Sequence, residues 1–192
     1  MAINRKELKA AAKEQIKGNI LTFFGLSIII GLILSVSSSI VIGPLILEGP
    51  LSLGLTMFIL QVVREKEGEF ETGFKGFKQF VPSFVATLLI SIFFILWSLL
   101  LVIPGIIAAL SYSMTFFIIA DNPGISGLEA IKKSKEMMKG HKAELFFLQL
   151  SFFWWGLLCV ITLGIAAIYV SPYVHATIAN FYEKIKSENT AA

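Results

Sequence analysis

The chain has 192 residues, of which 56% are hydrophobic and only 15% are charged, with a mean hydropathy of +0.80. A soluble domain carries about 25% charged residues, so the composition excludes a water-soluble globule and predicts a single membrane domain, 1–192. The single cysteine, Cys159, excludes an intrachain disulfide, and the mild net charge of +3 hides an uneven distribution of basic residues.

The N-terminal segment, 1–17, is basic and precedes the first apolar run. That run continues from Gly18 to about Ile42, which is longer than the core of about 7–15 residues in a signal peptide. No small-residue cleavage site with a polar start follows it. We therefore expect a retained first membrane span.

Long stretches without charge predict membrane-embedded helices. A helix rises ~1.5 Å per residue and the hydrocarbon core is about 30 Å thick, so about 20 residues cross it. The stretch from Gln79 to Ala120 is about twice as long, and Pro104-Gly105 lies where a turn is needed. Gly43-Pro44 and Thr162-Leu163-Gly164 divide the first and last stretches in the same way.

The prediction is an all-α integral membrane fold, with six membrane-embedded helices arranged as three hairpins. Their expected ranges are 18–42, 50–63, 83–103, 105–120, 144–162 and 165–182. The helix 50–63 is short, and whether it spans fully is left open. All 16 Lys and Arg residues lie before, between or after the hairpins, and the hairpin tips carry only Glu48. Basic loops stay in the cytoplasm, so both termini are expected there.

A spacing of about 61 residues relates the three parts of the chain. Lys17, Lys78 and Lys139 are 61 residues apart, and each closes a basic segment before a span. The same spacing links one position in the second helix of each hairpin: Leu51, Tyr112 and Tyr173. Repeats of the same topology are related by an axis along the membrane normal. This predicts a pseudo-threefold bundle with units 1–63, 64–124 and 125–186 and a disordered tail, 187–192; the alternative is coincidence between common residue types.

Each unit begins with a basic segment that has one apolar side. Leu8, Ala12 and Ile16, for example, recur at helical spacing. Such periods are typical of amphipathic helices that lie in the membrane interface with lysines toward lipid phosphates. The interfacial basic residues singled out are Lys13, Lys17, Lys75, Lys78, Lys135 and Lys139. Two roles are open: sensing of lipid, or collars that anchor the bundle.

Polar side chains inside the apolar stretches are the candidates for a site, because they are expensive in lipid. They predict a polar path formed by Ser52, Ser111, Tyr112, Ser113, Tyr173 and His175. If the second helices of the hairpins surround the axis, these groups line a cavity; if they face neighbouring helices, the hydroxyls serve packing. Trp97, Trp154 and Trp155 fall in the middle of spans and are expected to be packing residues.

No motif for catalysis or for cofactor or metal binding is visible. The chain lacks His-Glu-x-x-His, Gly-x-Ser-x-Gly, phosphate-binding glycine loops and zinc-ligand spacing. Asp121-Asn122-Pro123 is typical of an ordinary helix stop. We expect a protein that is not an enzyme, with no cofactor, no metal and no nucleic-acid partner.

Several segments resemble an uncharacterised bacterial membrane family. They are Gly49-Pro-Leu-Ser-Leu-Gly-Leu, Trp97-Ser-Leu-Leu-Leu-Val-Ile-Pro-Gly-Ile-Ile, Ser111-Tyr-Ser-Met-Thr-Phe-Phe, Ala130-Ile-Lys-Lys-Ser and Met138-Lys-Gly-His-Lys. The family is known as domain of unknown function 975 (DUF975), and it is similar to the membrane domain attached to some glycerophosphodiester phosphodiesterases. The resemblance spans almost the whole chain and implies a multi-pass protein of the bacterial cytoplasmic membrane. It also suggests that the protein interacts with lipid. It brings no established catalytic or binding residue.

The functional hypothesis is a non-enzymatic membrane protein that transports or handles a small or amphiphilic, lipid-like substrate. The alternative is a membrane scaffold that binds a partner without transport, and an intramembrane enzyme is the third hypothesis. Transport predicts a cavity that reaches Tyr112, Tyr173 and His175. A scaffold predicts a solid axis, and an enzyme predicts a convergent acid–base pair.

Overall fold

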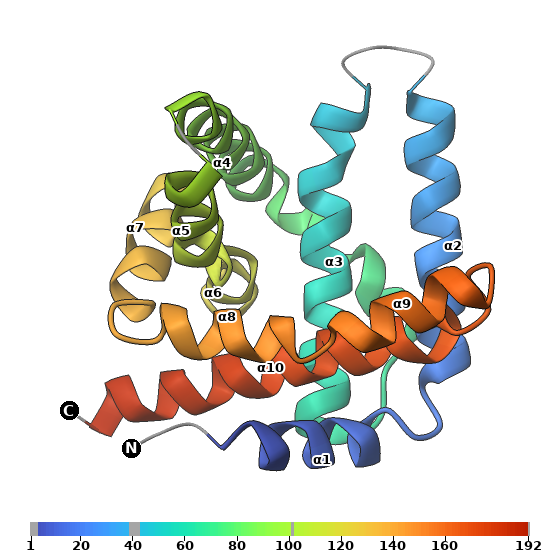
Figure 1. Ribbon diagram of the computed structural model, residues 1–192. Coiled ribbons are helices and arrows are strands. Elements are labelled where there is room, and N and C mark those ends of the chain that lie inside the picture. Colours follow the sequence, from blue (N-terminus) through green and yellow to red (C-terminus); the bar gives the residue numbers. More distant parts are fainter. Residues whose placement is uncertain (1–3, 39–42, 101, 192) are drawn as a thin grey trace.

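The computed structural model describes residues 4–38, 43–100 and 102–191, and every element in these ranges is helical (Figure 1). In chain order the helices are α1 (Arg5–Gln15), α2 (Ile20–Ser37), α3 (Gly43–Glu65), the 3-10 helix η1 (Phe70–Gln79), α4 (Phe80–Leu100), α5 (Val102–Tyr112), α6 (Thr115–Asp121), α7 (Gly127–Met137), α8 (Lys142–Leu150), α9 (Phe153–Ile161) and α10 (Ala167–Ala191). The all-helical prediction is therefore confirmed for this part of the chain.

Consecutive helices pair into three hairpins. In the first, α2 packs against α3; in the second, α4 packs against α5; and in the third, α9 packs against α10. Helix α6 continues the returning arm of the second hairpin, and α8 begins the outgoing arm of the third. The basic segments that precede the hairpins fold as α1, η1 and α7. Figure 1 shows the first hairpin standing across the direction of the third, so the arms do not share one parallel axis.

Five helical stretches are long and apolar enough to cross a membrane by length and composition: Ile20–Ser37, Gly43–Glu65, Phe70–Trp97, Ile103–Asp121 and Lys142–Ile161. They support the membrane assignment, but within the described residues they number five and not the predicted six. The predicted sixth span, 165–182, lies in α10. There, polar residues such as His175 and Asn180 interrupt the apolar sequence, and the helix continues into charged residues.

The second helix of the first hairpin is longer than predicted. Helix α3 has 23 residues and begins at Gly43, where the prediction has 50–63. Pro44 lies in its first turn, where the missing N–H has no helical partner to lose, so the residues expected to form a turn begin the helix instead. Pro104 likewise lies in the first turn of α5.

Two predicted helices are each broken into two. The range 105–120 is divided between α5 and α6, and the range 144–162 between α8 and α9. At the first break the Ser113 hydroxyl donates to the Leu110 carbonyl oxygen at 2.8 Å, and at the second the Ser151 hydroxyl donates to the Leu148 carbonyl oxygen at 2.5 Å. Such local bonds compete with the helical ladder and favour a break.

Helix α10 continues to Ala191, so residues 187–191, which the prediction assigns to a tail, are helical in the structure. The fully buried Ile185 fixes this part of the helix to the core. The Asn189 side-chain amide donates to the Ile185 carbonyl oxygen at 2.9 Å, which supports the last turns.

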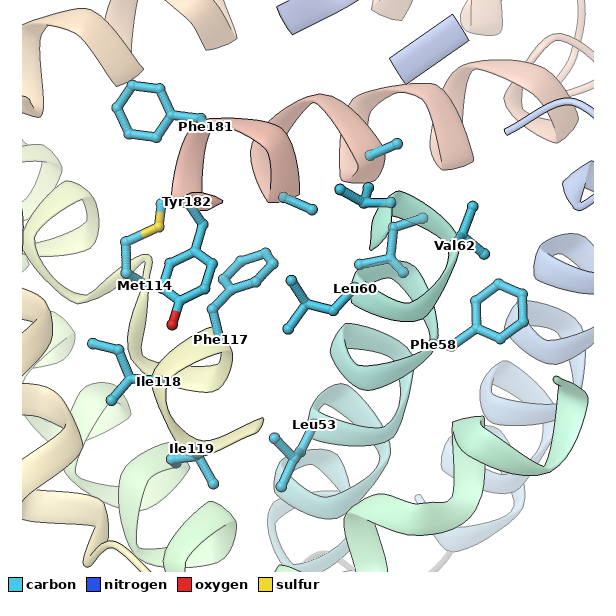
Figure 2. Packing of buried hydrophobic residues seen from close by; sticks show 14 of the residues in the cluster. Leu53, Phe58, Leu60, Val62, Met114, Phe117, Ile118, Ile119, Phe181 and Tyr182 are labelled. Carbon is cyan, nitrogen blue, oxygen red and sulfur yellow. The ribbon is translucent and has the colours of Figure 1, made fainter. Parts of the chain in front are cut away.

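The returning arms form the inside of the molecule. In an 18-residue apolar window of each stretch, buried residues make up 56% in α3 and 50% in Ile103–Asp121, against 11% in α2 and 17% in each stretch that contains α4 or α8–α9. In Figure 2, Leu60 of α3 points toward Phe117 of α6 and Tyr182 of α10. The rings of Phe117 and Tyr182 stack with their centroids 5.1 Å apart. The outgoing arms thus leave most of their apolar surface uncovered, which is typical of helices that contact lipid.

The basic helices pack against arms of other hairpins. Helix α1 lies against α10, η1 against α3, and α7 against α4 and α6. The closest approach is at Gly54 of α3, where an added Cβ would lie 1.7 Å from the Gly73 carbonyl oxygen of η1. Glycine, which has no Cβ, allows two backbones to come this close. The basic helices are therefore part of the packed structure.

Candidate functional site

The six residues of the predicted polar path do not gather in one place. Ser111 and Tyr112 line a cleft beside the second hairpin. Tyr173 lies elsewhere, against the rings of Phe152 and Trp155 with centroids 5.2 and 5.8 Å away. His175 packs against Phe23, with ring centroids 5.3 Å apart, and its Nδ1 lies 2.9 Å from the Ser171 carbonyl oxygen. Ser52, Ser113, Tyr173 and His175 line none of the clefts discussed below.

Hydroxyl groups on the returning arms bond largely within their own helices. Thr56 donates to the Ser52 carbonyl oxygen at 2.8 Å, and Ser111 donates to the Ile107 carbonyl oxygen at 2.7 Å. A hydroxyl that is satisfied in this way needs neither water nor a neighbouring helix. These contacts favour neither the polar path nor packing by hydrogen bonds between helices.

Ser134 of α7 does join two segments. Its hydroxyl donates to the Ser111 carbonyl oxygen at 2.8 Å and accepts from the Met114 backbone N–H at 3.2 Å. Both bonds are buried and lie at the break between α5 and α6. Ser134 therefore satisfies backbone groups that the broken helix leaves unpaired, and it holds α7 in place.

A cleft of about 240 Å³ lies between the second hairpin and helices α7 and α8. We call it the lysine cleft; its lining residues are Trp97, Pro104, Ile107, Ala108, Ser111, Tyr112, Lys135 and Lys142. The side chains of Lys135 and Lys142 have no hydrogen-bond or ion-pair partner within the described ranges. Two unpaired ammonium groups beside an apolar wall form the arrangement that holds an anionic group attached to an apolar tail.

The basic residues of α1 lie over aromatic rings of the third hairpin. Lys9 Nζ is 4.1 Å from the centroid of the Phe152 ring and 3.3 Å from the Ser151 carbonyl oxygen. Lys13 Nζ is 5.7 Å from the centroid of the Tyr173 ring. Burial lowers the pKa of Lys9, and the positive charges of Arg5 and Lys13 lower that pKa further. These contacts place the charges of α1 beside the middle of the third hairpin.

The other basic residues singled out from the sequence are exposed. Lys17 pairs with Glu14 at 2.8 Å, and Lys75 pairs with Glu69 at 3.4 Å. Lys78 and Lys139 lie at the end of η1 and just after α7. Exposed ion pairs add little stability, so these lysines remain available to lipid phosphates.

Two of the three tryptophans are not the packing residues that the sequence predicts. The Trp154 side chain is 72% exposed. The Trp97 side chain is 43% exposed and lines the lysine cleft. Their helices, α9 and α4, are outgoing arms, which lie outside the core. Trp155 is half-buried against Tyr169 and Tyr173, with ring centroids 6.3 and 5.8 Å away.

A charged cluster joins the ends of the three returning arms. Its members are Arg64 of α3, Asp121 of α6, and Tyr182, Glu183 and Lys186 of α10. The Asp121 carboxylate accepts from Arg64 at 2.8 Å, from Tyr182 at 2.8 Å and from Lys186 at 2.6 Å. Arg64 also donates to Glu183 at 2.6 Å. The Asp121 side chain is 9% exposed, so these ion pairs are screened less than those on an open surface.

Clefts lie on both sides of the charged cluster. One, of about 300 Å³, reaches Arg64, Lys75 and Asp121. The other, of about 340 Å³, reaches Lys133, Glu136, Tyr182 and Lys186. Both mix acids with bases: the first balances two bases with two acids and the second has two bases and one acid, whereas the lysine cleft has two bases and no acid. No group of three His, Cys, Asp or Glu side chains within the described residues is placed to hold a metal ion.

The charged cluster is the feature that sequence reasoning misses. Asp121 is expected to be an ordinary helix stop, whereas the structure places it between two cations from other helices. The signal was its position: Asp121 is the first charged residue after the charge-free stretch that begins at Gln79. An ionisable group at the edge of such a stretch calls for a partner.

Comparison with known proteins identifies a family match. The family model described as "Protein of unknown function (DUF975)" matches the chain at residues 1–107 and again at 98–189. The two matches together cover nearly all of the chain. No curated protein and no solved structure matches it.

Proposed function

The chain belongs to the DUF975 family of proteins of unknown function, and we propose that it is a membrane-embedded, non-enzymatic protein that binds and handles an anionic, lipid-like amphiphile. The observation that carries the proposal is the pair of unpartnered lysines, Lys135 and Lys142, on an otherwise largely apolar cleft. The ammonium groups suit a phosphate or carboxylate, and Trp97 and Ile107 suit the start of a hydrocarbon chain.

The size and position of the lysine cleft fit such a ligand. A volume of about 240 Å³ holds a headgroup with its first carbons, and the rest of a chain continues over exposed apolar side chains such as Ile103 and Ile106, which are 70% and 42% exposed. A small polar solute would leave that surface uncovered.

The proposed architecture around this site is a ring of three units of about 61 residues. Three small residues at this spacing are buried on the basic helices: Ala12, Gly73 and Ser134. Three more are buried on the returning arms: Gly54, Thr115 and Ala176. The basic helices α1, η1 and α7 each pack against the returning arm of another hairpin, with α1 against α10 closing the ring. Matched small residues at matched crossings support a repeat over coincidence.

The proposed location is the bacterial cytoplasmic membrane, with both termini on the cytoplasmic side. The confinement of all Lys and Arg residues to segments outside the hairpin tips supports this orientation. The basic helices and the lysine cleft then face the inner leaflet. The anionic headgroups of that leaflet are a source of ligand.

A binding assay tests the lysine cleft. The protein, in neutral detergent, is titrated with tail-labelled phosphatidylglycerol, with phosphatidylcholine as the ligand of no net charge. The variant Lys135→Gln/Lys142→Gln removes both cleft charges, and Lys132→Gln/Lys139→Gln removes two exposed charges nearby that do not line the cleft. At about 1 kcal/mol for each lysine, the cleft variant is expected to bind roughly thirtyfold more weakly.

The control variant separates a site from general attraction to positive charge. The proposal requires that Lys132→Gln/Lys139→Gln keeps at least most of the affinity for phosphatidylglycerol. Equal losses in both variants, or equal affinity for the two lipids in the unchanged protein, would contradict it.

A further inference from the structure

The exposed apolar surface runs along the outgoing arms, from Leu21 and Val81 at their starts (77% and 66% exposed), and reaches the tips of the hairpins. The first hairpin exposes Leu32 and Val36 by 60% and 74%, the second exposes Ile95 and Ile103 by 58% and 70%, and the third exposes Val160 and Leu163 by 72% and 93%. The opposite ends of the returning arms are different. They are packed into the core and carry the charged cluster around Asp121.

Lysine side chains of α1 contact the third hairpin partway between its base and its tip. In the third hairpin, Lys9 contacts the Ser151 carbonyl oxygen and the Phe152 ring, and Lys13 lies over the Tyr173 ring. These contacts come from α1 and involve both arms of the third hairpin.

Measured along the helices, the distance from this level to the tip is at most about half of the hydrocarbon core. The turn of the third hairpin is at Leu163 and Gly164, which have φ of 50° and 90°. Ser151 and Tyr173 are 12 and 10 residues away from Leu163, about 18 and 15 Å along a helix. The complete core is about 30 Å thick.

A hairpin that crossed the whole bilayer would place these lysines near its centre. A Lys at that depth costs about 2.5–3.5 kcal/mol or more. Part of the cost is avoided when a lysine side chain extends toward the surface, but Lys9 is held in place by its contacts with Ser151 and Phe152. Full crossing would impose this cost for Lys9 and Lys13 together.

We propose that the three hairpins enter only one leaflet, with their tips near the bilayer centre and with Lys9 and Lys13 at the level of the phosphates. The partner of the exposed apolar surface is therefore the acyl-chain layer of a single leaflet. The charged cluster of Arg64, Asp121 and Glu183 then lies on the aqueous side of that leaflet. This depth does not depend on amphiphile binding in the lysine cleft.

One tryptophan agrees with this depth. Trp154 is three residues beyond Ser151. Tryptophan is enriched at the boundary between headgroups and chains. Embedding in one leaflet brings the 72% exposed ring of Trp154 close to that boundary, whereas full crossing would place it near the bilayer centre.

Spin labels on the third hairpin provide the test, because the two arrangements reverse the order of depth. Cys159→Ala removes the native thiol, and Leu150→Cys and Leu163→Cys then add label sites that are 53% and 93% exposed. The labelled proteins are reconstituted in vesicles of phosphatidylethanolamine and phosphatidylglycerol. Depth is measured from relaxation by oxygen, which concentrates at the bilayer centre, and by a nickel chelate, which stays in water. Lys139→Cys is the control for an exposed site.

The expected result is a label at Leu163→Cys that lies about 10–20 Å deeper than the label at Leu150→Cys, with the Lys139→Cys label in water. A label at Leu150→Cys near the bilayer centre, with Leu163→Cys at the headgroups, would overturn the proposal, and so would equal depths.

A second measurement needs no cysteine. In the variant Trp97→Phe/Trp155→Phe, Trp154 is expected to be quenched more by lipids brominated near the headgroup than by lipids brominated near the chain ends; the opposite order would overturn the proposal.

Discussion

Side-chain volume at the helix crossings determines how closely the chain packs. Gly54 and Gly25 both lie inside helices, yet their surroundings are opposite. A Cβ on Gly54 would meet the Gly73 carbonyl oxygen at 1.7 Å, whereas a Cβ on Gly25 would meet nothing within 4 Å. The same substitution therefore has opposite expected effects at the two positions.

Gly54→Ala should destabilise the protein, because η1 must move away from α3 to make room for the methyl group. Overpacking of this kind costs about 1–3 kcal/mol or more. Gly25→Ala should be neutral or stabilising by up to about 1 kcal/mol, since alanine favours a helix over glycine. Equilibrium unfolding in mixed micelles, with increasing dodecyl sulfate, measures both. A smaller loss for Gly54→Ala than for Gly25→Ala would show that the two backbones are not in contact.

Among the helices, α1 connects the beginning of the chain to its end. The Gln15 amide donates to the Val63 carbonyl oxygen at 3.0 Å and exchanges hydrogen bonds of 2.5 and 3.2 Å with Asn180. Ala12, one turn earlier, is fully buried, whereas its neighbour Ala11 is exposed. The docking of α1 therefore depends on one face of a short helix.

Ala12→Leu is expected to lift α1 from α10, because three additional carbon atoms have no space at the contact. Backbone amides of Arg5–Gln15 should then exchange hydrogen with solvent much faster, as in a helix without tertiary support. Ala11→Leu adds the same atoms on the exposed face and should leave this exchange unchanged. Hydrogen exchange followed by mass spectrometry compares the two, and equal protection would refute the proposed role of Ala12.

Which segments form helices was easier to predict from the sequence than how the helices pack against one another. Charge-free runs and basic segments are local properties, so the arms of the hairpins and the helices before them follow from the sequence. The helix breaks near Ser113 and Ser151 depend on the carbonyl oxygen to which each hydroxyl donates its hydrogen bond. The direction of each hairpin depends on contacts between helices, such as that of Gly54 with Gly73. The contact between Gly54 and Gly73 joins two different helices, and hydropathy does not reveal such a contact.

For the whole molecule, one carboxylate connects the three returning arms. Asp121 on α6 binds Arg64 of α3 and Lys186 of α10 at 2.8 and 2.6 Å. Arg64 is also held by Glu183 at 2.6 Å. Removal of the central charge leaves two cations that face each other without a shared anion.

Asp121→Asn is expected to lower the free energy of unfolding by about 3 kcal/mol, the scale for breaking a mostly buried ion pair. Glu14→Gln is the matched control, because its pair with Lys17 is 68% exposed on both sides; its effect should stay within about 0.5 kcal/mol. Unfolding in mixed micelles provides both values. Similar values for the two variants would mean that the cluster is as well solvated as a surface pair.

The candidate site was only partly predictable. Ser111, Tyr112 and Lys135 were singled out from the sequence for separate reasons, and the structure places all three on the lysine cleft. Lys142 was not singled out and Trp97 was expected to be a packing residue, because their place on the cleft depends on how α7 and α8 fold over the second hairpin. Tyr173 and His175, expected on the same path, lie against other partners since the hairpins do not run parallel.

The hairpins extend only a short distance from the level of the lysines to their tips, and this has a mechanical consequence for the membrane. Three wedges that enter one monolayer enlarge its area and leave the facing monolayer as it was. A lipid sheet with unequal areas bends toward the smaller side, and insertion of this kind is sensitive in turn to the curvature that is already present. A protein of this shape would therefore collect where the bilayer is curved, and it would strengthen that curvature as it accumulates.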